Sequence, residues 1–453
     1  MIVAADTIAA IATPAGRGGI GIVRVSGPRT PHIAREITRQ DLTPRRAHLA
    51  SFFDARGEVL DQGLALFFPA PHSYTGEHVL ELHGHGGPAV LALVLARCLH
   101  LGARLAAPGE FTQRAFLNGK LDLAQAEAVA DLIDAGSATA ARAAARSLSG
   151  EFSQAVHAIA DALLELRALT EASLDFPEED IDFVRAADAA GRLERTRAEL
   201  STLMQRARRG SLLREGLTIV LVGRPNVGKS SLMNRLAQED VAIVTEIAGT
   251  TRDALRSHID IQGIPVTIVD TAGLRPTDDP IETIGIDRTW TAVAQASLAI
   301  VIRDARTTDR DAQDSDILAR LPPSLPRILV HNKIDLCDTL PQRVQPQAAP
   351  VEVWLSARTG AGVDLLEAAI LDIAGVHEDL ESAFLARTRH LEALSEASRH
   401  LDAATAEITG TAPALELLAE ELRSAHEALG TIVGITTADD LLGAIFSRFC
   451  IGK

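Results

Sequence analysis

The stretch from Gly223 to Ser231, which reads GRPNVGKSS, constrains the fold more than any other feature of this chain. It follows the apolar run Leu217 to Val222 and precedes a helix-like segment. An apolar strand, a glycine-rich loop and a helix in this order are typical of a phosphate-binding loop, because the loop amides and the helix N-terminus favour anions. Lys229 is expected to reach the outer phosphates, and the Ser230 hydroxyl is expected to bind magnesium.

The composition and the spacing of apolar residues change along the chain and predict a multidomain α/β plus α protein. Residues 1–118 are rich in Gly, Pro and strand-forming residues, so we expect an N-terminal α+β domain. Residues 119–215 and 376–453 show apolar residues at helical spacing, whereas residues 216–375 alternate apolar strands with helices. We therefore expect an α/β phosphate-loop domain inserted into a helical domain that is made of the two flanking pieces. The end of the chain, AIFSRFCIGK, is predicted to be a tail with exposed Cys, Gly and Lys.

The composition excludes several classes of protein. The net charge of −16 argues against a broadly basic nucleic-acid-binding surface. No apolar run reaches the length of a membrane span, and the N-terminus MIVAADTIAA lacks the basic cluster of a signal peptide. The cysteines Cys98, Cys337 and Cys450 lie far apart, which suits a reducing cytoplasm and gives no zinc-binding spacing.

The densest group of basic residues leaves two interpretations open. Arg206, Arg208, Arg209 and Arg214 could form a local RNA-binding patch. The cluster taken alone is more typical of a solvated basic linker before the α/β domain.

Two motifs downstream of the phosphate loop indicate which nucleotide binds. PVTIVDTAG places Asp270 and Gly273 after a strand, where the carboxylate can act on magnesium through water and the glycine amide can meet a γ-phosphate. RILVHNKID places Asn332, Lys333 and Asp335 after another strand. The Asp335 carboxylate can accept hydrogen bonds from N1 and the 2-amino group of guanine, a pattern that adenine does not offer.

A third motif, VEVWLSART, places Ser356 and Ala357 where a backbone amide can meet the guanine O6. Many GTPases have lysine at the position of Arg358, and the aliphatic stem of either residue can stack on the base. The motifs occur in a fixed order after apolar strands, which favours GTP over ATP. Incidental Asn and Asp residues in an ordinary doubly wound fold would not explain the whole set.

The usual water-positioning glutamine is missing, because Leu274 occupies its place. Glu282, in PIETIGIDRT, is the carboxylate beyond this switch segment that suits the role, and it could act on the attacking water through a bridging water. The alternative interpretation of Glu282 is an exposed glutamate that starts a helix.

Asn226 lies inside the phosphate loop, where its side-chain oxygen could hold a monovalent cation beside the phosphates. A cation there would take the place of an arginine finger. The segment 244–253, VTEIAGTTRD, is expected to close over it, with Thr251 as the switch threonine for magnesium and Thr250 beside it.

Two further patterns are interpreted as structural. Gly16, Gly18 and Gly21 match the GxGxxG dinucleotide fingerprint, but a strand-like segment follows them instead of a helix. His83 and His85 in HGHGG have no third metal ligand at useful spacing, and we expect a turn before a helix there.

These motifs, together with segments outside the α/β region, resemble the MnmE (TrmE) family of potassium-activated tRNA modification GTPases along essentially the whole chain. Ribosome-assembly GTPases share the GTP motifs but not the flanking segments. The segments that carry the resemblance are GRPNVGKSS, TEIAGTTRD, DTAGLR, IETIGIDR and NKID in the α/β region, DTIAAIATPAGRGGIGIVRVSG, YTGEHVLELHGHGGP and GEFTQRAFLNGKLDLAQAEAVADLIDA before it, and the terminal FCIGK.

The resemblance implies an activity and partners. The family works with the flavoprotein MnmG to add an aminomethyl or carboxymethylaminomethyl group at C5 of the wobble uridine of certain tRNAs. A folate derivative, 5-formyl- or methylene-tetrahydrofolate, is taken to supply the carbon. The N-terminal domains dimerise and bind folate, and the GTPase domains approach each other when GTP and potassium are bound. We accordingly expect a cytoplasmic homodimer.

The resemblance also implies roles for residues in the GTPase region. Glu282 would be the catalytic carboxylate, with positioning or coupling roles for Arg252, Asp253 and Arg275. Potassium would be held by Asn226, Thr245, Ile247 and Thr250, and magnesium by Ser230 and Thr251. The expected GTP-binding positions are Asn226, Val227, Gly228, Lys229, Ser230, Ser231, Thr245, Glu246, Ile247, Ala248, Gly249, Thr250, Thr251, Asp270, Thr271, Ala272, Gly273, Asn332, Lys333, Asp335, Ser356, Ala357 and Arg358.

The folate site implied by the resemblance consists of Arg24, Glu81, Lys120 and Lys453. A carboxylate such as Glu81 suits the donor–acceptor edge of a pterin, and Arg or Lys suits the anionic glutamate tail. Without the resemblance, Arg24 and Lys120 would be interpreted as surface charge. Cys450 is a candidate reactive thiol, whose reactivity depends on its surroundings.

Two functions remain open at this point. One is a GTP-driven component of a tRNA-modifying enzyme, and the other is a regulatory GTPase switch that binds RNA or ribosomes without one-carbon chemistry. The folate-type N-terminal domain and the FCIGK terminus favour the first, because a pure switch needs neither.

Overall fold

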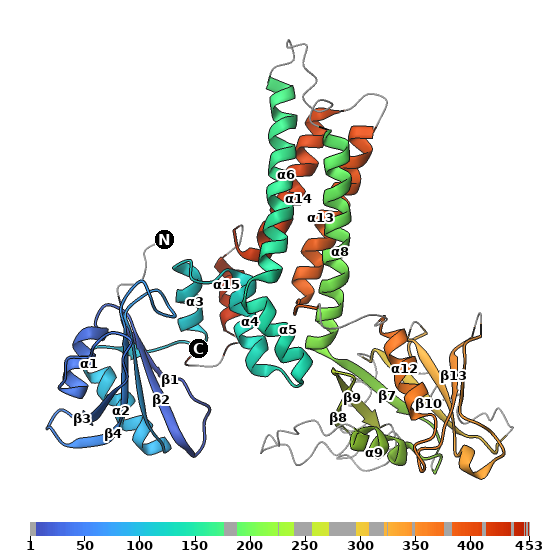
Figure 1. Ribbon diagram of the computed structural model, residues 1–453, viewed down its shortest axis with the longest axis horizontal. Coiled ribbons are helices and arrows are strands. Elements are labelled where there is room, and N and C mark those ends of the chain that lie inside the picture. The colour runs from blue at the N-terminus through green and yellow to red at the C-terminus, as the bar shows by residue number, and fades with distance from the viewer. Residues whose placement is uncertain are drawn as a thin grey trace, which may run out of the picture. The chain divides into compact units, whose positions relative to one another are not determined.

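Segments that are far apart in the sequence build two compact units, each of which is described by itself (Figure 1). One unit consists of Met1–Ala130, Leu148–Ala190 and His400–Lys453, and the other of Asp131–Ser147 and Gly191–Arg399. The structure, a computed structural model, describes residues 6–175, 188–224, 226–239, 256–270, 296–307, 321–323, 325–346, 349–375, 383–409, 414–435, 439–447, 449 and 452.

The first unit contains a six-stranded sheet in the order β3-β4-β5-β2-β1-β6. Neighbouring strands are antiparallel, except that β1 and β6 run parallel. The segments GIGIVRVSG and GLALFFPA, which are rich in strand-forming residues, lie largely in β2 and β4. The strands are β1 Ile8–Ile11, β2 Gly18–Ser26, β3 His48–Phe53, β4 Val59–Phe68, β5 Val79–Gly86 and β6 Arg104–Leu105.

Helices α1 (Thr30–Thr38) and α2 (Pro88–His100) cover one face of this sheet (Figure 1). Phe52 of β3 is fully buried in the core beneath them. Successive side chains of a strand point to opposite faces, so Leu49 of β3 and its partner Leu64 of β4 lie on the other face. These two leucines are 67% and 42% exposed, which leaves that face partly bare.

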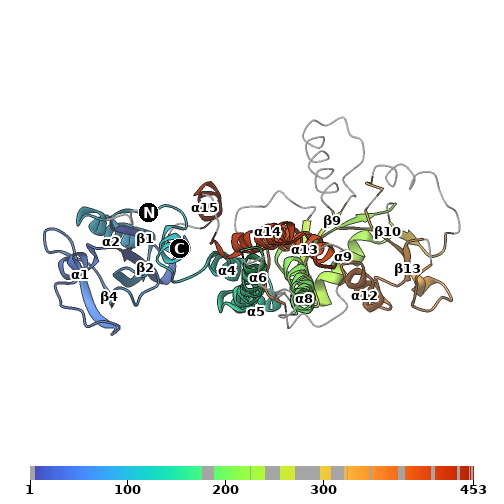
Figure 2. The same cartoon turned by 90° about the horizontal axis from the view of Figure 1, so that it is seen from above.

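The remaining elements of the first unit are helical, as the sequence predicted for these segments. Helices α6 and α14 lie side by side along their lengths (Figure 1 and Figure 2). The C-terminal helix α15 packs on α3 and α4 through Phe446, which contacts Phe116. The helices with segments in this unit are α3 Glu110–Leu117, α4 Leu123–Asp134, α6 Glu151–Asp175, α13 Thr388–Thr409, α14 Leu415–Val433 and α15 Asp439–Phe446.

The glycine of the C-terminal tail is buried, so the prediction that it is exposed was wrong. Gly452 has a φ of +99°, and a Cβ there would collide with the carbonyl oxygen of Ile11. Phe449 is likewise only 6% exposed. Apolar burial and a close backbone approach to β1 therefore hold this end of the chain against its own unit.

The second unit contains a seven-stranded sheet in the order β12-β13-β11-β10-β7-β9-β8. The five inner strands are parallel, and the edge strands β8 and β12 are antiparallel to their neighbours. Successive strands leave β7 in opposite directions, which makes the carboxyl end of β7 a topological switch point. The strands are β7 Leu217–Val222, β8 Arg256–Ile261, β9 Ile264–Asp270, β10 Leu298–Asp304, β11 Arg327–Asn332, β12 Gln342–Val344 and β13 Val351–Trp354.

Both faces of this sheet bury apolar side chains, as expected for a doubly wound fold. Helices α9 and α12 share one core with α5, and Val220 and Val301 lie in a separate core. Together with the first unit, this confirms the predicted class, a phosphate-loop α/β fold combined with α+β and helical parts. The helical elements with segments in this unit, besides α13, are α5 Ala138–Leu148, α8 Ala189–Glu215, α9 Lys229–Glu239, η2 Ile334–Leu336 and α12 Val363–Ile373.

The tip of the β8–β9 hairpin packs against the start of α5. Ser137 Oγ, just before the helix, donates a 3.0 Å hydrogen bond to the carbonyl oxygen of Gly263. Gly263 has a φ of +91°, and a Cβ there would lie 2.5 Å from Thr139 Oγ1. Ala143 of α5 and Ile264 of β9 are fully buried in the same core. A piece of the helical sequence thus completes the core of the α/β sheet.

The basic cluster lies inside α8, so its interpretation as a linker was wrong. The guanidinium of Arg206 lies 4.7 Å from the ring centroid of Phe384, and Arg214 Nε donates to Asp131 Oδ1 at 3.0 Å. Apolar residues recur at helical spacing along α8, and this spacing predicts the structure of the segment better than its local density of charge does. Two members of the cluster are thereby engaged in packing within the unit.

Candidate nucleotide-binding site

The phosphate loop leaves β7 at the carboxyl edge of the parallel strands and enters α9. Open α/β sheets bind ligands at this edge. Gly228 has a φ of +100°, and a Cβ there would collide with the side-chain amide of Asn332. Glycine is therefore required at this position both for the backbone conformation and for the close approach of Asn332.

The Lys229 side chain folds back into the loop. The residue is 8% exposed, and its Nζ donates to the carbonyl oxygens of Gly223 at 2.8 Å and Arg224 at 3.0 Å. Phosphate oxygens are stronger acceptors for an ammonium group than these neutral carbonyls. Ser230, the second residue of α9, is exposed, so its hydroxyl is accessible to a ligand.

Asn332 ties the phosphate loop to the segment after β13. Its side chain is nearly buried, with the residue 2% exposed. Its Nδ2 donates to Val227 O at 2.7 Å, and its Oδ1 accepts from Ala357 N at 2.9 Å. The structure thus brings together three residues that the sequence assigned to one site.

Lys333 reaches the phosphate loop from the same motif. Its Nζ lies 2.6 Å from the carbonyl oxygen of Asn226 and 2.9 Å from Asp304 Oδ2. Asn226 is exposed and has a φ of +62°, in the left-handed region that Asn tolerates better than most residues. Its side-chain oxygen is therefore accessible to a ligand while its backbone is held.

The groups expected to read guanine lie at one edge of the sheet. Ser356 Oγ donates to Asp335 Oδ1 at 2.7 Å, which orients a carboxylate on an exposed residue. The Ala357 amide donates to Asn332 here, so contact with a guanine O6 requires this N–H to be shared. The side chain of Arg235 in α9 donates to the carbonyl oxygen of Arg358 at 2.8 Å and so holds the same segment.

Sequence reasoning missed Asp304 and Arg235. Asp304 ends β10, directly opposite Asn332 in the parallel register. Carboxyl ends of neighbouring parallel strands meet at one edge, so the Asp in VIRDAR could have been found by the rule that identified Asn332. Arg235 belongs to an amphipathic helix, and nothing in its sequence context distinguishes it from a surface arginine.

Many predicted positions lie outside the described residues. Asp270 ends β9, as the sequence predicted. The expected switch, potassium, catalytic and C-terminal positions outside the described residues are Thr245, Glu246, Ile247, Ala248, Gly249, Thr250, Thr251, Arg252, Asp253, Thr271, Ala272, Gly273, Leu274, Arg275, Glu282, Cys450 and Lys453.

Arg24 and Glu81, both expected in the folate site, are brought together in the first unit. Arg24 of β2 donates to Glu81 Oε1 of β5 from Nε at 3.0 Å and from its terminal nitrogen at 2.9 Å. The other Glu81 oxygen lies 3.2 Å from His83 Nε2. The guanidinium also lies 5.3 Å from the centroid of the Tyr74 ring. Lys120 lies in the turn that follows α3 and is exposed.

The two histidines of HGHGG lie within β5, so the expected turn begins only after them. His85 Nδ1 is 2.7 Å from Asp61 Oδ1, and the His85 amide donates to Asp61 Oδ2 at 2.8 Å. Burial raises the pKa of Asp61, but these hydrogen bonds from His85 outweigh it and lower the net pKa. The His85–Asp61 pair joins β5 to β4. Gly18 and Gly21 lie within β2, so a strand stands where a dinucleotide fingerprint requires a helix.

A charged cluster surrounds the buried side chain of Arg114 in the same unit. Arg114 donates to Glu110 Oε1 and to Asp6 Oδ1 at 2.8 Å each, and lies 3.1 Å from Glu77 Oε2. Burial raises the pKa of Glu110, but hydrogen bonds from Arg104, the Ala107 amide and Arg114 outweigh it and lower the net pKa. Glu110 is therefore ionised at neutral pH and paired with both arginines.

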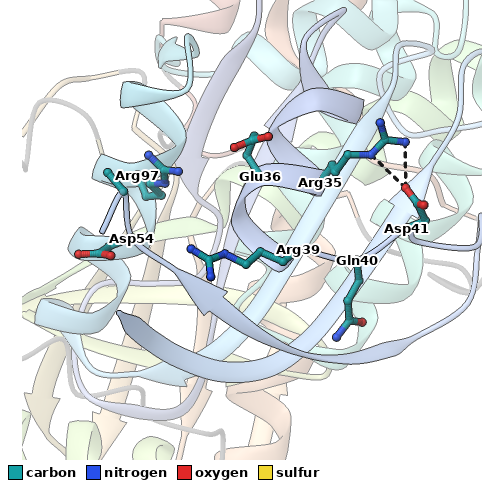
Figure 3. Close-up of a pocket in the computed structure, with 8 residues that line it drawn as sticks. Arg35, Glu36, Arg39, Gln40, Asp41, Asp54 and Arg97 are labelled. Carbon is teal, nitrogen blue, oxygen red and sulfur yellow. Dashed lines mark hydrogen bonds and ion pairs between the residues drawn. The ribbon is translucent and has the colours of Figure 1, made fainter. Parts of the chain in front are cut away.

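A polar cavity of about 390 Å³ lies elsewhere on this unit (Figure 3). In its wall the exposed side chains of Arg35 and Asp41 pair at 2.9 Å, and the Arg39 guanidinium lies 4.4 Å from the centroid of the Phe53 ring. Acidic and basic groups are balanced in its wall, so no charge sign dominates. The lining residues are Arg35, Glu36, Arg39, Gln40, Asp41, Asp54, Ala55 and Arg97.

Other kinds of site are not found in the part of the chain that the structure describes. Within it, no group of three or more His, Cys, Asp or Glu side chains could hold a metal ion. No helix there is both long and apolar enough to traverse a bilayer. Burial raises the pKa of the Cys98 thiol to about 12, which keeps this cysteine protonated and unreactive.

Comparison with known proteins finds similarity along the whole chain. The profile of the MnmE helical domain matches residues 123–450, and that of the GTP-binding protein TrmE N-terminus matches residues 7–120. The tRNA modification GTPase MnmE of Dechloromonas aromatica (strain RCB) is 58% identical over 448 residues, with 99% of each chain covered.

A second relative also matches nearly the whole chain. The tRNA modification GTPase MnmE of Ralstonia nicotianae is 57% identical over 458 residues, which cover 98% of this chain and 96% of that protein. Among solved structures, the FeoB G-domain from Methanococcus jannaschii is 26% identical, with a TM-score of 0.26, and matches 35% of this chain and 98% of its own.

Proposed function

Because this chain belongs to the MnmE family of tRNA modification GTPases, we propose that it hydrolyses GTP to GDP and phosphate and couples this reaction to tRNA modification. The observation that carries the nucleotide part is the hydrogen-bonded connection of Val227, Asn332 and Ala357. It joins the loop expected to bind phosphates to the segments expected to bind guanine, at the carboxyl edge of the sheet.

The phosphate loop supplies the charge that a nucleotide needs. In the bound state Lys229 would exchange its contacts with Gly223 O and Arg224 O for oxygens of the β- and γ-phosphates. The amides at the start of α9 would face the same oxygens, since a helix N-terminus favours anions. Asp335 would accept the two N–H groups of guanine while Ser356 orients its carboxylate.

The magnesium and potassium sites remain proposals that the described residues fit. The exposed Ser230 hydroxyl is an oxygen donor of the kind magnesium prefers, and Thr251 would be its second ligand. Asn226 offers an accessible amide oxygen to potassium, with Thr245, Ile247 and Thr250 as further ligands. Potassium bound there would supply positive charge beside the phosphates.

Hydrolysis itself would depend on residues of the switch segments. Leu274 has no group to orient water, so Glu282 would take that role through a bridging water. Arg252, Asp253 and Arg275 would position or couple the same segments.

The first unit would hold a tetrahydrofolate derivative, 5-formyl- or methylene-tetrahydrofolate, that supplies one carbon. Glu81 would read the pterin edge, because a carboxylate oxygen that already accepts from Arg24 has a second lone pair. The Tyr74 ring beside Arg24 offers an aromatic face for a flat ligand. Lys120 and Lys453 would meet the anionic glutamate tail, and Cys450 stays a candidate thiol.

The bare face of the N-terminal sheet supports a homodimer. Leu49 and Leu64 are paired across β3 and β4 on this face and are 67% and 42% exposed. Exposed apolar side chains gathered on one sheet face mark an interaction site. A second copy would bury them, and the flavoprotein MnmG would join this homodimer in the cytoplasm to modify C5 of the wobble uridine.

The decisive experiment is mass spectrometry of wobble uridines in tRNA from cells that lack this protein. Loss of the aminomethyl-type modification, restored by the wild-type gene, is the expected result. Calorimetry with 5-formyl-tetrahydrofolate separates this function from a regulatory switch. Wild-type protein should bind it, and Glu81→Gln should not. Unchanged tRNA together with no folate binding would leave a GTPase switch as the function.

A further inference from the structure

Asp304 holds a position in the nucleotide site that no motif assigns to it. It is the last residue of β10, and its register partner is Asn332. The carbonyl oxygen of Asn332 accepts a 2.8 Å hydrogen bond from the amide of Ala305, which fixes the end of β10 beside the guanine motif. The Asp304 side chain is 13% exposed, so its charge is largely withdrawn from water.

The Asp304 carboxylate uses both oxygens. Oδ1 accepts from the amide of Arg306 at 3.1 Å and from its Nε at 3.0 Å. Oδ2 accepts from the Arg306 terminal nitrogen at 2.7 Å and from Lys333 Nζ at 2.9 Å. The Arg306 hydrogen bonds and then the Lys333 ammonium hold the pKa of Asp304 well below its usual range, so the carboxylate is ionised wherever the protein is folded near neutral pH.

Lys333 carries this contact onward to the phosphate loop. Its Nζ bridges Asp304 Oδ2 and the carbonyl oxygen of Asn226, at 2.9 Å and 2.6 Å. Both Lys333 and Asn226 have positive φ, at +70° and +62°. Residues in this backbone region need surrounding contacts to stay there, and the bridge joins two of them directly.

We propose that Asp304 is a positioning residue for the nucleotide: through Lys333 it holds the phosphate loop at Asn226 in the conformation that binds GTP and GDP. The inference rests on the proposed GTP-binding role of this site. A lysine without Asp304 would retain only the neutral carbonyl as partner and would lose its fixed direction. The ligand would then have to order Lys333 and the loop when it binds, which lowers affinity.

The test compares nucleotide affinity and turnover in full-length variants at saturating potassium and magnesium. Asp304→Asn keeps the size of the side chain and removes its charge. We expect the Kd for a fluorescent GDP analogue and the KM for GTP to rise about tenfold, since a hydrogen bond to a charged group is lost. The kcat at saturating GTP should stay within about twofold, because the lost contact affects binding and not the chemical step.

Arg306→Gln is the matched control. It removes the other partner of Asp304 but leaves the Asp304–Lys333 contact in place, so its Kd should match the wild type. Asp304→Glu should restore part of the lost affinity. An Asp304→Asn protein with a normal Kd would overturn the proposal whatever its kcat, because nucleotide binding would then not depend on the charge of Asp304.

A double-mutant cycle decides the matter even where Asp304→Asn folds poorly. If Asp304 acts through Lys333, adding Asp304→Asn to Lys333→Ala should cost no further affinity. Additive losses would overturn the proposal. A wild-type protein that binds no guanine nucleotide would instead reject the proposed function, so the two failures are distinguishable.

Discussion

The side-chain amide of Asn332 donates a 2.7 Å hydrogen bond to the carbonyl oxygen of Val227, and its oxygen accepts the amide of Ala357. Asn332→Ala removes both contacts and leaves two backbone groups unpaired in a buried place. We expect the free energy of unfolding to fall by about 2 kcal/mol and GDP affinity to fall at least about tenfold. Chemical denaturation and fluorescent GDP titration measure the two effects, and wild-type affinity with reduced stability would deny Asn332 a role in the site.

Base selectivity should follow the carboxylate of Asp335. Asp335→Asn replaces one acceptor oxygen with an amide donor, so the guanine 2-amino group loses its partner while the 2-oxo group of xanthine gains one. GTP affinity should fall about a hundredfold, because one hydrogen bond becomes a donor–donor contact and the other loses its charged acceptor. Competition between GTP and XTP checks this. A variant that disfavours both nucleotides equally would place Asp335 outside base recognition.

Potassium dependence should be lost with the side chain of Asn226. Wild-type protein should hydrolyse GTP faster in potassium than in sodium at equal ionic strength. Asn226→Ala should hydrolyse at the same slow rate in both salts while it still binds GDP, because Lys333 holds the backbone carbonyl and not the side chain. Equal rates for the wild type in both salts would contradict the cation site.

Acid should weaken the first unit through Glu110. Its folded pKa is depressed, so its stabilising contribution is complete above the ordinary value of 4.5 and is lost as the pH falls through the folded pKa. Glu110→Gln leaves Arg114 and Arg104 short of a charged partner, so we expect a loss of about 3 kcal/mol at neutral pH. The stability of the wild type should approach that of the variant as the pH falls below 4.5 and through the folded pKa of Glu110. Unfolding curves across this range test the convergence, and parallel curves would contradict it.

Self-association should depend on the bare sheet face. Leu49→Glu places a charge on a residue that is 67% exposed, so the fold of the monomer should tolerate it. A dimer that buries this face would dissociate at least about tenfold more readily. Analytical ultracentrifugation reports the change. Leu340→Glu, at an 82% exposed leucine of the other unit, is the matched control and should leave association unchanged.

Much of the fold and the nucleotide site could be predicted because local patterns determine them. The loop glycines, the strand ends at Asp270 and Asn332, and the helical spacing of α4 and α6 each depend on neighbours in the sequence. The pairing of Asp304 with Lys333 is harder to predict, because Lys333 lies just after β11 and the contact depends on the register of β10 and β11.

The failures share a physical cause. Gly452 was expected to be exposed as part of a short tail, but the Ile11 carbonyl of β1 lies against it and the residue is buried. The arginines around Arg206 suggested a linker because their charge density does not show which face of a helix each residue occupies. Both errors concern contacts with distant segments, which local patterns do not specify.

The contact of Ser137 with Gly263 makes the β8–β9 hairpin a structural link between the nucleotide edge and α5. One end of the hairpin carries Asp270, the first residue of a switch motif, and the other end is fastened to α5. A hydrogen-bonded hairpin is rigid along its strands, so a displacement at one end also displaces the other end. A displacement of Asp270 at the nucleotide edge would therefore move the tip of the hairpin and, with it, the start of α5.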